Sequence, residues 1–175
     1  AHDHKKRMDK LIEDLGKKKH THKPVTTIKV TIEDNGAISF YNDGDGIHVE
    51  FLKKHKMYPP ELIFGTLLSS TNFDDGDQRE WGGRNGYGAK LANIFGKLFR
   101  VETVDHFNNK KFVQEFSNNM NDKTVPKITT VTKATPYTKI TWLPDYERFG
   151  MSGMSDDILS IIKKRVYDIA GVTDK

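Results

Sequence analysis

Two glycine-rich segments combine polar side chains with closely spaced glycines, and they are the parts of the sequence best suited to bind a ligand. They are residues 42–47 (NDGDGI) and residues 82–90 (GGRNGYGAK). Glycine lets the backbone adopt positive φ and bring its N–H groups close to a ligand. A helix that begins directly after the second segment would add partial positive charge at its first turn. The second segment therefore predicts a site for an anion such as phosphate.

The common phosphate-binding motifs do not fit the second segment. Residues 83–88 have the glycine spacing of a P-loop, but Ala89 and Lys90 follow where Lys and then Ser or Thr are needed. A dinucleotide-binding fingerprint would need a third glycine where Leu91 stands and a strand before the loop. Either segment alone could be a structural turn. Residue types by themselves leave both interpretations open.

Taken together, the two segments resemble the GHKL ATPases, which include gyrases, heat-shock chaperones, histidine kinases and mismatch-repair proteins. Within them the sequence is most similar to eukaryotic-type DNA topoisomerase II. NDGDGI resembles the Asp/Asn-x-Gly-x-Gly box, and residues 70–75 (STNFDD) resemble the serine-serine-asparagine-tyrosine-acid stretch. Residues 82–95 (GGRNGYGAKLANIF) resemble the glycine lid. Residues 56–68 and 165–171 fit the same family, so the resemblance covers the whole chain.

The resemblance implies ATP and Mg²⁺ as cofactors and assigns the residues that hold the nucleotide. It places Asn42 at the adenine edge, where an amide can both donate and accept hydrogen bonds. It places Ser70, Thr71 and Asn72 near the ribose and phosphates. The lid residues expected around the triphosphate are Gly83, Arg84, Asn85, Gly86, Tyr87, Gly88, Ala89 and Lys90. Backbone N–H groups and the two cations of this set suit phosphate oxygens.

The resemblance also implies that parts of the active site lie outside the 175 residues. The family's general-base Glu and magnesium-ligating Asn would precede Ala1, because Ala1-His2-Asp3 matches only the end of their motif. A lysine that reaches the γ-phosphate would follow Lys175. We expect no catalytic base and no metal ligand within the chain, and negligible ATP hydrolysis by these residues alone. His4 and Thr71 depart from the usual Asn and Ser of cellular relatives.

The function that the resemblance implies is that of the ATP-hydrolysing N-terminal gate of a type II DNA topoisomerase, with residues 1–175 forming one partial GHKL domain. Duplex DNA and a second copy of the chain are the expected partners. The expected location is the nucleus, or the virion or host cytoplasm for a virus. The alternatives are a non-hydrolysing GHKL sensor or dimerisation module, and another GHKL ATPase, which the LIFG and glycine-lid segments disfavour.

Composition narrows the class of protein further. With 175 residues and 35% hydrophobic residues, the chain can close one core. The absence of cysteine excludes disulfides, thiolate zinc sites and cysteine nucleophiles. A mean hydropathy of −0.66 and the lack of a long apolar run give no membrane span. Residues 1–29 carry nine Lys or Arg against four Asp or Glu, which suits either a DNA contact or a solvated surface.

The elements that must position these segments follow from the spacing of apolar residues. We predict a β-hairpin at 25–33 and 37–41, and further antiparallel strands at 99–107, 110–116, 127–131 and 138–142. We predict helices at 2–15, 59–68 and 89–98, a loop at 69–88, and a core-facing helix at 155–171. The fold class is α+β, a two-layer α/β sandwich whose mixed, mostly antiparallel sheet is covered by helices on one face.

Overall fold

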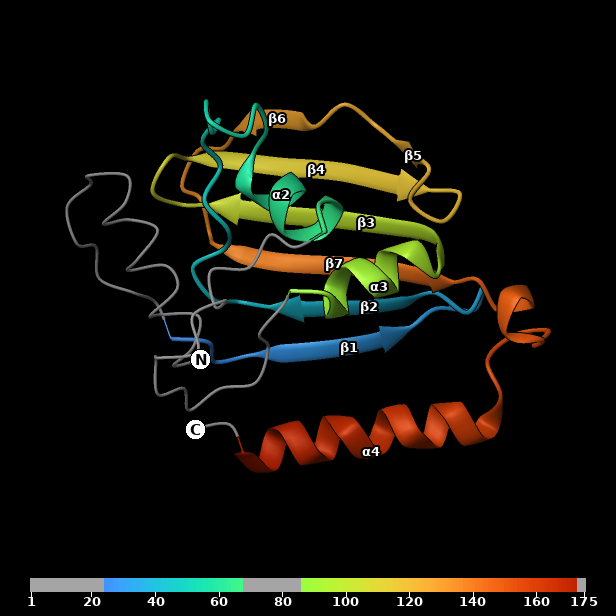
Figure 1. Cartoon of the computed structure of the whole chain (residues 1–175). Helices are drawn as coiled ribbons and strands as arrows, with labels where there is room; N and C mark the ends of the chain where they lie inside the picture. Colours follow the sequence, from blue (N-terminus) through green and yellow to red (C-terminus); the bar gives the residue numbers. More distant parts are fainter. Residues whose placement is uncertain (1–23, 68–85, 173–175) are drawn as a thin grey trace, which may run out of the picture.

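The computed structural model describes residues 24–67 and 86–172 (Figure 1). The helix predicted at 2–15 and nearly all of the loop predicted at 69–88 lie outside the described residues. In the described part, seven strands form one sheet in the order β1-β2-β7-β3-β4-β5, and β6 also pairs with β4. Every pairing is antiparallel. The strands are β1 (Ile28–Ile32), β2 (Ile38–Asn42), β3 (Gly96–Asp105), β4 (Lys110–Ser117), β5 (Asp122–Lys123), β6 (Lys127–Thr130) and β7 (Tyr137–Pro144).

The first hairpin forms as the sequence predicts. Its turn places Gly36 at φ +81°, and the Asn35 side-chain oxygen accepts a hydrogen bond from the Ala37 N–H at 2.9 Å. This local bond is the reason that Asn favours such turns. Ile32 then pairs with Ile38, so the register of β1 and β2 is fixed from the turn outward.

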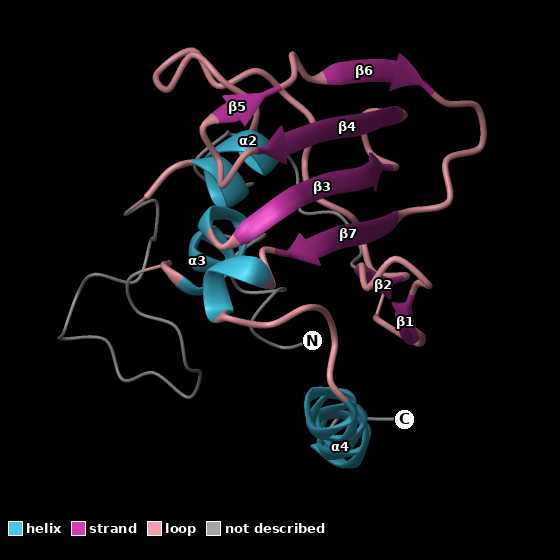
Figure 2. Ribbon diagram, turned by 90° about the vertical axis from the view of Figure 1, so that its right-hand side faces the viewer, coloured by secondary structure: helices cyan, strands magenta, loops and turns pink. Residues whose placement is uncertain are grey.

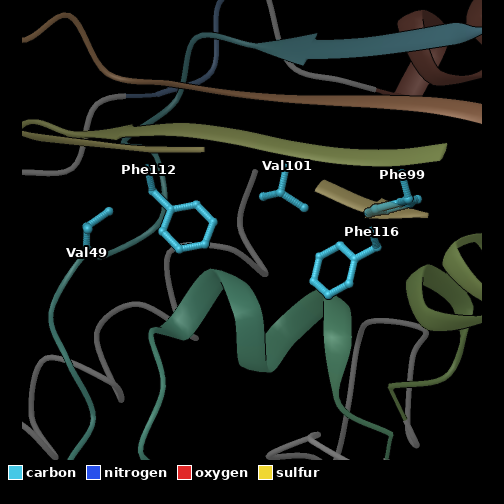
Figure 3. Close-up of a cluster of buried hydrophobic side chains, with 5 residues drawn as sticks. All are labelled: Val49, Phe99, Val101, Phe112 and Phe116. Carbon is cyan, nitrogen blue, oxygen red and sulfur yellow. The ribbon is translucent and has the colours of Figure 1, made fainter. Parts of the chain in front are cut away.

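The core lies between the sheet and two short helices on one of its faces, α2 (Pro59–Gly65) and α3 (Gly88–Ile94) (Figure 2). Because side chains alternate along a strand, β3 and β4 present apolar residues to this face and charged residues to the other. The buried cluster comprises Val49, Phe99, Val101, Phe112 and Phe116. Figure 3 shows Phe112 and Phe116 pointing from the sheet toward α2. The predicted sandwich with helices on one face of an antiparallel sheet is confirmed.

The predicted ends of two helices were wrong, and one short strand was missed. Helix α3 ends at Ile94, whereas the sequence predicted a helix to residue 98, because Gly96 already begins β3. A Cβ at Gly96 would lie 2.7 Å from the Trp142 indole nitrogen, so this glycine permits close packing of β3 on β7. Helix α2 ends at Gly65, three residues earlier than predicted. The two-residue strand β5 was not predicted.

Helix α4 (Asp156–Val172) begins where the sequence predicted, but it does not face the core. The Ser155 hydroxyl caps it by accepting a hydrogen bond from the Ile158 N–H at 3.3 Å. No residue of α4 is buried, and Ile161 is 59% exposed. Figures 1 and 2 show the helix apart from α2 and α3, with Figure 1 placing it alongside the β1 edge of the sheet. An apolar stripe indicates that a helix has an apolar face, but not which surface covers that face.

No helix in residues 24–67 and 86–172 has the length and apolar character needed to cross a membrane.

Candidate functional site

The loop that follows β2 is held by its own polar side chains. Asn42 is the last residue of β2, and its side-chain oxygen accepts a hydrogen bond from the Gly44 N–H at 3.2 Å. The Asp43 carboxylate accepts hydrogen bonds from the N–H groups of Thr26 and Thr27 at 2.9 and 2.8 Å. These bonds tie the loop to the segment that precedes β1. The side-chain nitrogen of Asn42 makes no hydrogen bond to another described residue, so it is free to donate to a ligand.

Gly46 brings the same loop into close contact with β3. It has φ +76°, and a Cβ at this position would lie 2.0 Å from the carbonyl oxygen of Val104. Only glycine fits there, because both the left-handed backbone and the close approach exclude a side chain. The next residue, Ile47, donates its N–H to the hydroxyl oxygen of Thr103 at 2.9 Å. The loop is therefore fixed against the last residues of β3.

A row of polar side chains crosses the helix-covered face of the sheet at the end where β2 and β3 finish and β7 begins. Thr138 on β7 pairs with Asn42 on one side and with Thr103 on the other. The hydroxyl oxygens of Thr103 and Thr138 lie 3.0 Å apart, and the Thr103 hydroxyl also donates to the carbonyl of Tyr137 at 2.9 Å. Sequence reasoning missed Thr138. Its place at the start of a strand was predicted, but only the strand order shows that it lies beside Asn42.

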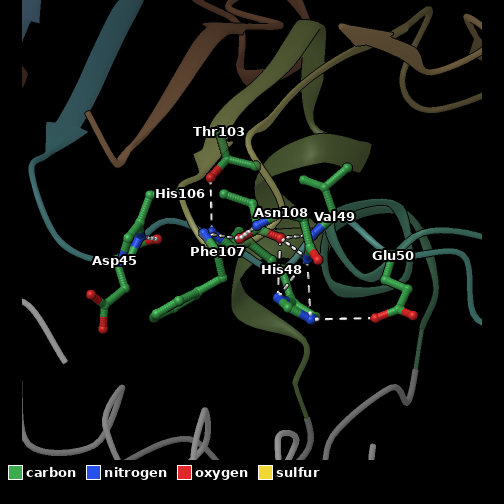
Figure 4. Close-up of polar contacts among 10 residues, drawn as sticks. Asp45, His48, Val49, Glu50, Thr103, His106, Phe107 and Asn108 are labelled. Atoms are coloured by element: carbon green, nitrogen blue, oxygen red, sulfur yellow. Dashed lines mark hydrogen bonds and ion pairs between the residues drawn. The ribbon is translucent and has the colours of Figure 1, made fainter. Parts of the chain in front are cut away.

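A buried carboxylate, Asp105, anchors the loop further along. Its Oδ2 accepts hydrogen bonds from the Val49 N–H at 2.7 Å and from the side-chain nitrogen of Asn108 at 2.6 Å. His48 Nδ1 lies 3.1 Å from the same oxygen, and His48 Nε2 lies 3.5 Å from Glu50 Oε2. Figure 4 shows His48, Val49 and Asn108 converging at this point.

The environment of Asp105 keeps its side chain ionised. The carboxylate is 1% exposed. Burial acts to raise the pKa of Asp105, but hydrogen bonds from His48, from the Val49 N–H and from Asn108 outweigh it and lower that pKa far below its ordinary value. Sequence reasoning missed Asp105 because no motif marks it. Two of its partners, His48 and Val49, come from a loop more than fifty residues earlier in the chain.

The start of α3 has the backbone features predicted for an anion site. Gly86 has φ +66°, Tyr87 is the N-cap residue, and the first helical hydrogen bond runs from the Leu91 N–H to the Tyr87 carbonyl at 2.8 Å. The N–H groups of the residues before Leu91 therefore have no acceptor within the helix. Gly88 does not share the positive φ of Gly86, and a Cβ there would meet no atom within 4 Å. The expectation that closely spaced glycines need positive φ is thus wrong for Gly88.

The lid residues that the structure describes point in different directions. Tyr87, Gly88 and Ala89 are exposed, whereas Lys90 is only 3% exposed. Asn93, one turn further, lies on the same helix face and donates its side-chain N–H to the Phe64 carbonyl at 3.0 Å. A buried ammonium is costly unless it is paired. Lys90 is therefore a lysine fixed by the fold and not a mobile surface cation, and its predicted phosphate contact stays a prediction.

Six predicted site residues lie outside the described residues: Ser70, Thr71, Asn72, Gly83, Arg84 and Asn85. Their assigned roles stay predictions. Among the described residues, Asn42 ends β2, and Gly88 begins α3, one of the two helices on one face of the sheet (Figures 1 and 2). The residues that the structure describes contain no group of three or more His, Asp or Glu side chains placed to hold a metal ion.

Comparisons with known proteins give a consistent result. No protein-family model matches the chain. It is 50% identical over 148 residues to DNA topoisomerase 2 of Acanthamoeba polyphaga mimivirus, a match that covers 84% of the chain and 12% of that protein. It is also similar to the crystal structure of the ATPase region of Saccharomyces cerevisiae topoisomerase II. That match has 48% identity and a TM-score of 0.77, and it covers 81% of the chain and 38% of the yeast structure.

A more distant structure supports the fold alone. The 43K ATPase domain of Thermus thermophilus gyrase B matches 95% of the chain with a TM-score of 0.64, at 21% identity, and the match covers 38% of that structure. The antiparallel sheet with helices on one face is thus shared beyond the range of clear sequence similarity.

Proposed function

The chain corresponds to part of the ATPase region of eukaryotic-type DNA topoisomerase II, and from this premise we propose that it binds ATP together with Mg²⁺ at the helix-covered face of its sheet. The chain spans about an eighth of the length of the mimivirus relative and less than half of the yeast ATPase region. We treat residues 1–175 as one part of a GHKL domain. The activity of the whole protein is likewise proposed.

The base end of the nucleotide site is formed by Asn42 and Thr138. Asn42 already uses its side-chain oxygen to hold the Gly44 N–H, so its side-chain nitrogen is the group free to donate to the adenine ring. The Thr138 hydroxyl lies across the strand pair from Asn42 and offers a second polar contact. A small hydroxyl beside an amide suits the flat, polar edge of a purine.

The phosphate end is formed by residues 83–90, with Ser70, Thr71 and Asn72 between the two ends. The features that support this assignment are the positive φ of Gly86 and the N–H groups at the start of α3, which have no acceptor within the helix. Arg84 and Lys90 supply charge-assisted contacts to phosphate oxygens. Bound Mg²⁺ would neutralise part of the phosphate charge. We assign neither the catalytic base nor a metal ligand to residues 1–175.

In the whole protein, ATP binding would close a gate between two copies of the chain around one DNA duplex. Hydrolysis would reset the gate after that duplex has passed through a double-strand break in another. Duplex DNA and a second copy of the chain are therefore the proposed partners. The proposed location is the nucleus, or the virion or host cytoplasm if the source is a virus.

The observation that carries this proposal is the joint likeness of sequence and fold to the ATPase region of yeast topoisomerase II. The experiment that tests it is relaxation of supercoiled plasmid by the full-length protein, with and without ATP. We expect relaxation to require both ATP and Mg²⁺. Repeated rounds of relaxation should be lost when ATP is replaced by a non-hydrolysable analogue. Relaxation that proceeds equally without ATP would contradict the proposal, and would favour a nucleotide sensor over an ATPase.

A further inference from the structure

One side chain, Asp105, joins two segments that are far apart in the sequence. Its Oδ2 holds the Val49 N–H and the Asn108 side chain, and its Oδ1 accepts hydrogen bonds from the N–H groups of Phe107 and Asn108 at 3.0 and 3.2 Å. The first contact belongs to the loop after β2, and the others belong to the turn between β3 and β4. A single carboxylate therefore links this turn to the loop that carries the NDGDGI segment.

Three consecutive residues of β3 hold that loop from one side. The Val104 carbonyl limits the approach of Gly46, the Thr103 hydroxyl accepts from the Ile47 N–H, and Asp105 accepts from the Val49 N–H. On the other side, Asn42 is fixed by its pairing with β7. The backbone between Asn42 and Val49 is thus fastened at both ends, and Asp105 is its only charged anchor on β3.

We infer that Asp105 is a positioning residue for the base end of the nucleotide site, an inference that rests on the proposed function and deepens it. Asp105 does not touch the nucleotide. It holds the backbone at Val49 and the ring of His48, and with Thr103, which holds the Ile47 N–H, it keeps the turn at Gly44 in place. This turn orients the Asn42 side chain through the bond between the Asn42 oxygen and the Gly44 N–H. Hydrogen bonds to an ionised carboxylate are stronger than those between neutral groups, which suits an anchor.

His48 adds to this anchor and is itself buried. Its ring is 4% exposed and lies between Asp105 and Glu50. A carboxylate beside Nδ1 favours the ring form with hydrogen on that nitrogen and fixes the orientation of the ring. His48 thereby adds a buried contact to the same carboxylate oxygen that accepts the Val49 N–H.

The test is the variant Asp105→Asn in the full-length protein, with ATP and GTP as the two probes. The variant keeps the size of the side chain and removes its charge. We expect affinity for ATP to fall about tenfold, because one charge-assisted anchor is lost. Affinity for GTP should change little, because the phosphate contacts are common to both nucleotides. The preference for ATP over GTP should therefore fall by a similar factor.

Glu102→Gln is the matched control. Glu102 lies on the same strand but on the opposite face of the sheet, where it contacts Lys111 at 3.2 Å, Arg100 at 3.3 Å and the Tyr137 hydroxyl. Its substitution also removes a charge from a hydrogen-bonded network. It therefore controls for the loss of stability that the removal of such a charge causes anywhere in β3. It cannot reach the loop after β2, and we expect both the affinity for ATP and the preference over GTP to stay unchanged.

The outcomes distinguish a failure of the proposed function from a failure of the positioning role of Asp105. If the unchanged protein binds no ATP, the proposed function fails, and the inference fails with it. If the unchanged protein binds ATP and Asp105→Asn keeps both affinity and preference, only the positioning role is overturned. An equal loss of ATP and GTP affinity would also overturn it, because that is the signature of a purely structural residue. Should Asp105→Asn not fold, Asn108→Ala removes one donor to the same carboxylate, and we expect the ATP preference to fall about threefold.

Discussion

Replacement of Gly46 by alanine should destabilise the protein far more than its small size suggests. The new Cβ would lie 2.0 Å from the Val104 carbonyl oxygen, an atom of the backbone that cannot rotate away. The left-handed φ of +76° costs an L-residue about 1 to 2 kcal/mol. Relief of the overlap moves the loop off β3 and breaks the hydrogen bonds that Ile47 and Val49 donate, each worth about 1 kcal/mol. We expect a loss of about 3 to 4 kcal/mol in the free energy of unfolding.

Urea unfolding followed by circular dichroism measures this loss, with Gly88→Ala as the matched control. Gly88 begins α3 without positive φ, and its Cβ would meet no atom within 4 Å. Alanine is the better helix former, so this variant should stay within about 1 kcal/mol of the unchanged protein. If Gly46→Ala also stays within 1 kcal/mol, the loop does not approach β3 as closely as the geometry indicates, and the reasoning about the anchors is refuted.

Three further predictions concern the phosphate end, acid stability and DNA. In the protein with Gly86→Val, ATP should no longer protect against proteolysis although the fold stays intact, because a β-branched residue does not tolerate φ +66°. Protection that persists would contradict the assignment of residues 83–90 to the phosphates. Asp105 has a lowered pKa, so its contribution to stability is complete above the ordinary aspartate value of about 3.9 and is lost as the pH falls below it. Asp105→Asn should therefore make the free energy of unfolding depend less on pH between about pH 4 and about pH 2. An unchanged pH dependence would show that other groups control acid stability. Changing Lys17, Lys18 and Lys19 to Gln should weaken binding to duplex DNA at low salt; equal binding would return this stretch to the solvated-surface interpretation.

Local patterns were sufficient to predict most of the sheet and the left-handed backbone at Gly86. The turn at Asn35 and Gly36 fixes the first hairpin through contacts within a few residues. The strands around Phe99 and Phe112 show the alternation expected where one face of a sheet is covered and the other is open. Glycine spacing predicted the positive φ of Gly86 but was wrong for Gly88, because glycine permits positive φ without requiring it.

Features that depend on contacts distant in sequence could not be predicted in the same way. The apolar residue Leu98 continues the helical spacing of Leu91 and Ile94, but its pairing with Leu143 of β7 places it in β3. The stripe on α4 predicted an apolar face, but its position depends on what lies beside it. Thr138 and Asp105 enter the site only through the strand order and the path of the loop, neither of which has a sequence motif.

Isothermal titration calorimetry with Mg-ATP tests the central claim most directly, on the full-length protein and on its Asn42→Ala variant. The control is Asn121→Ala, because Asn121 is an exposed asparagine in a turn of the same sheet. We expect Asn42→Ala to weaken ATP binding by about 1 to 3 kcal/mol, the cost of a purine edge left without its partner, and Asn121→Ala to leave it unchanged. Equal affinity in all three proteins, with each shown to be folded, would contradict the assignment of the loop after β2 as the adenine site.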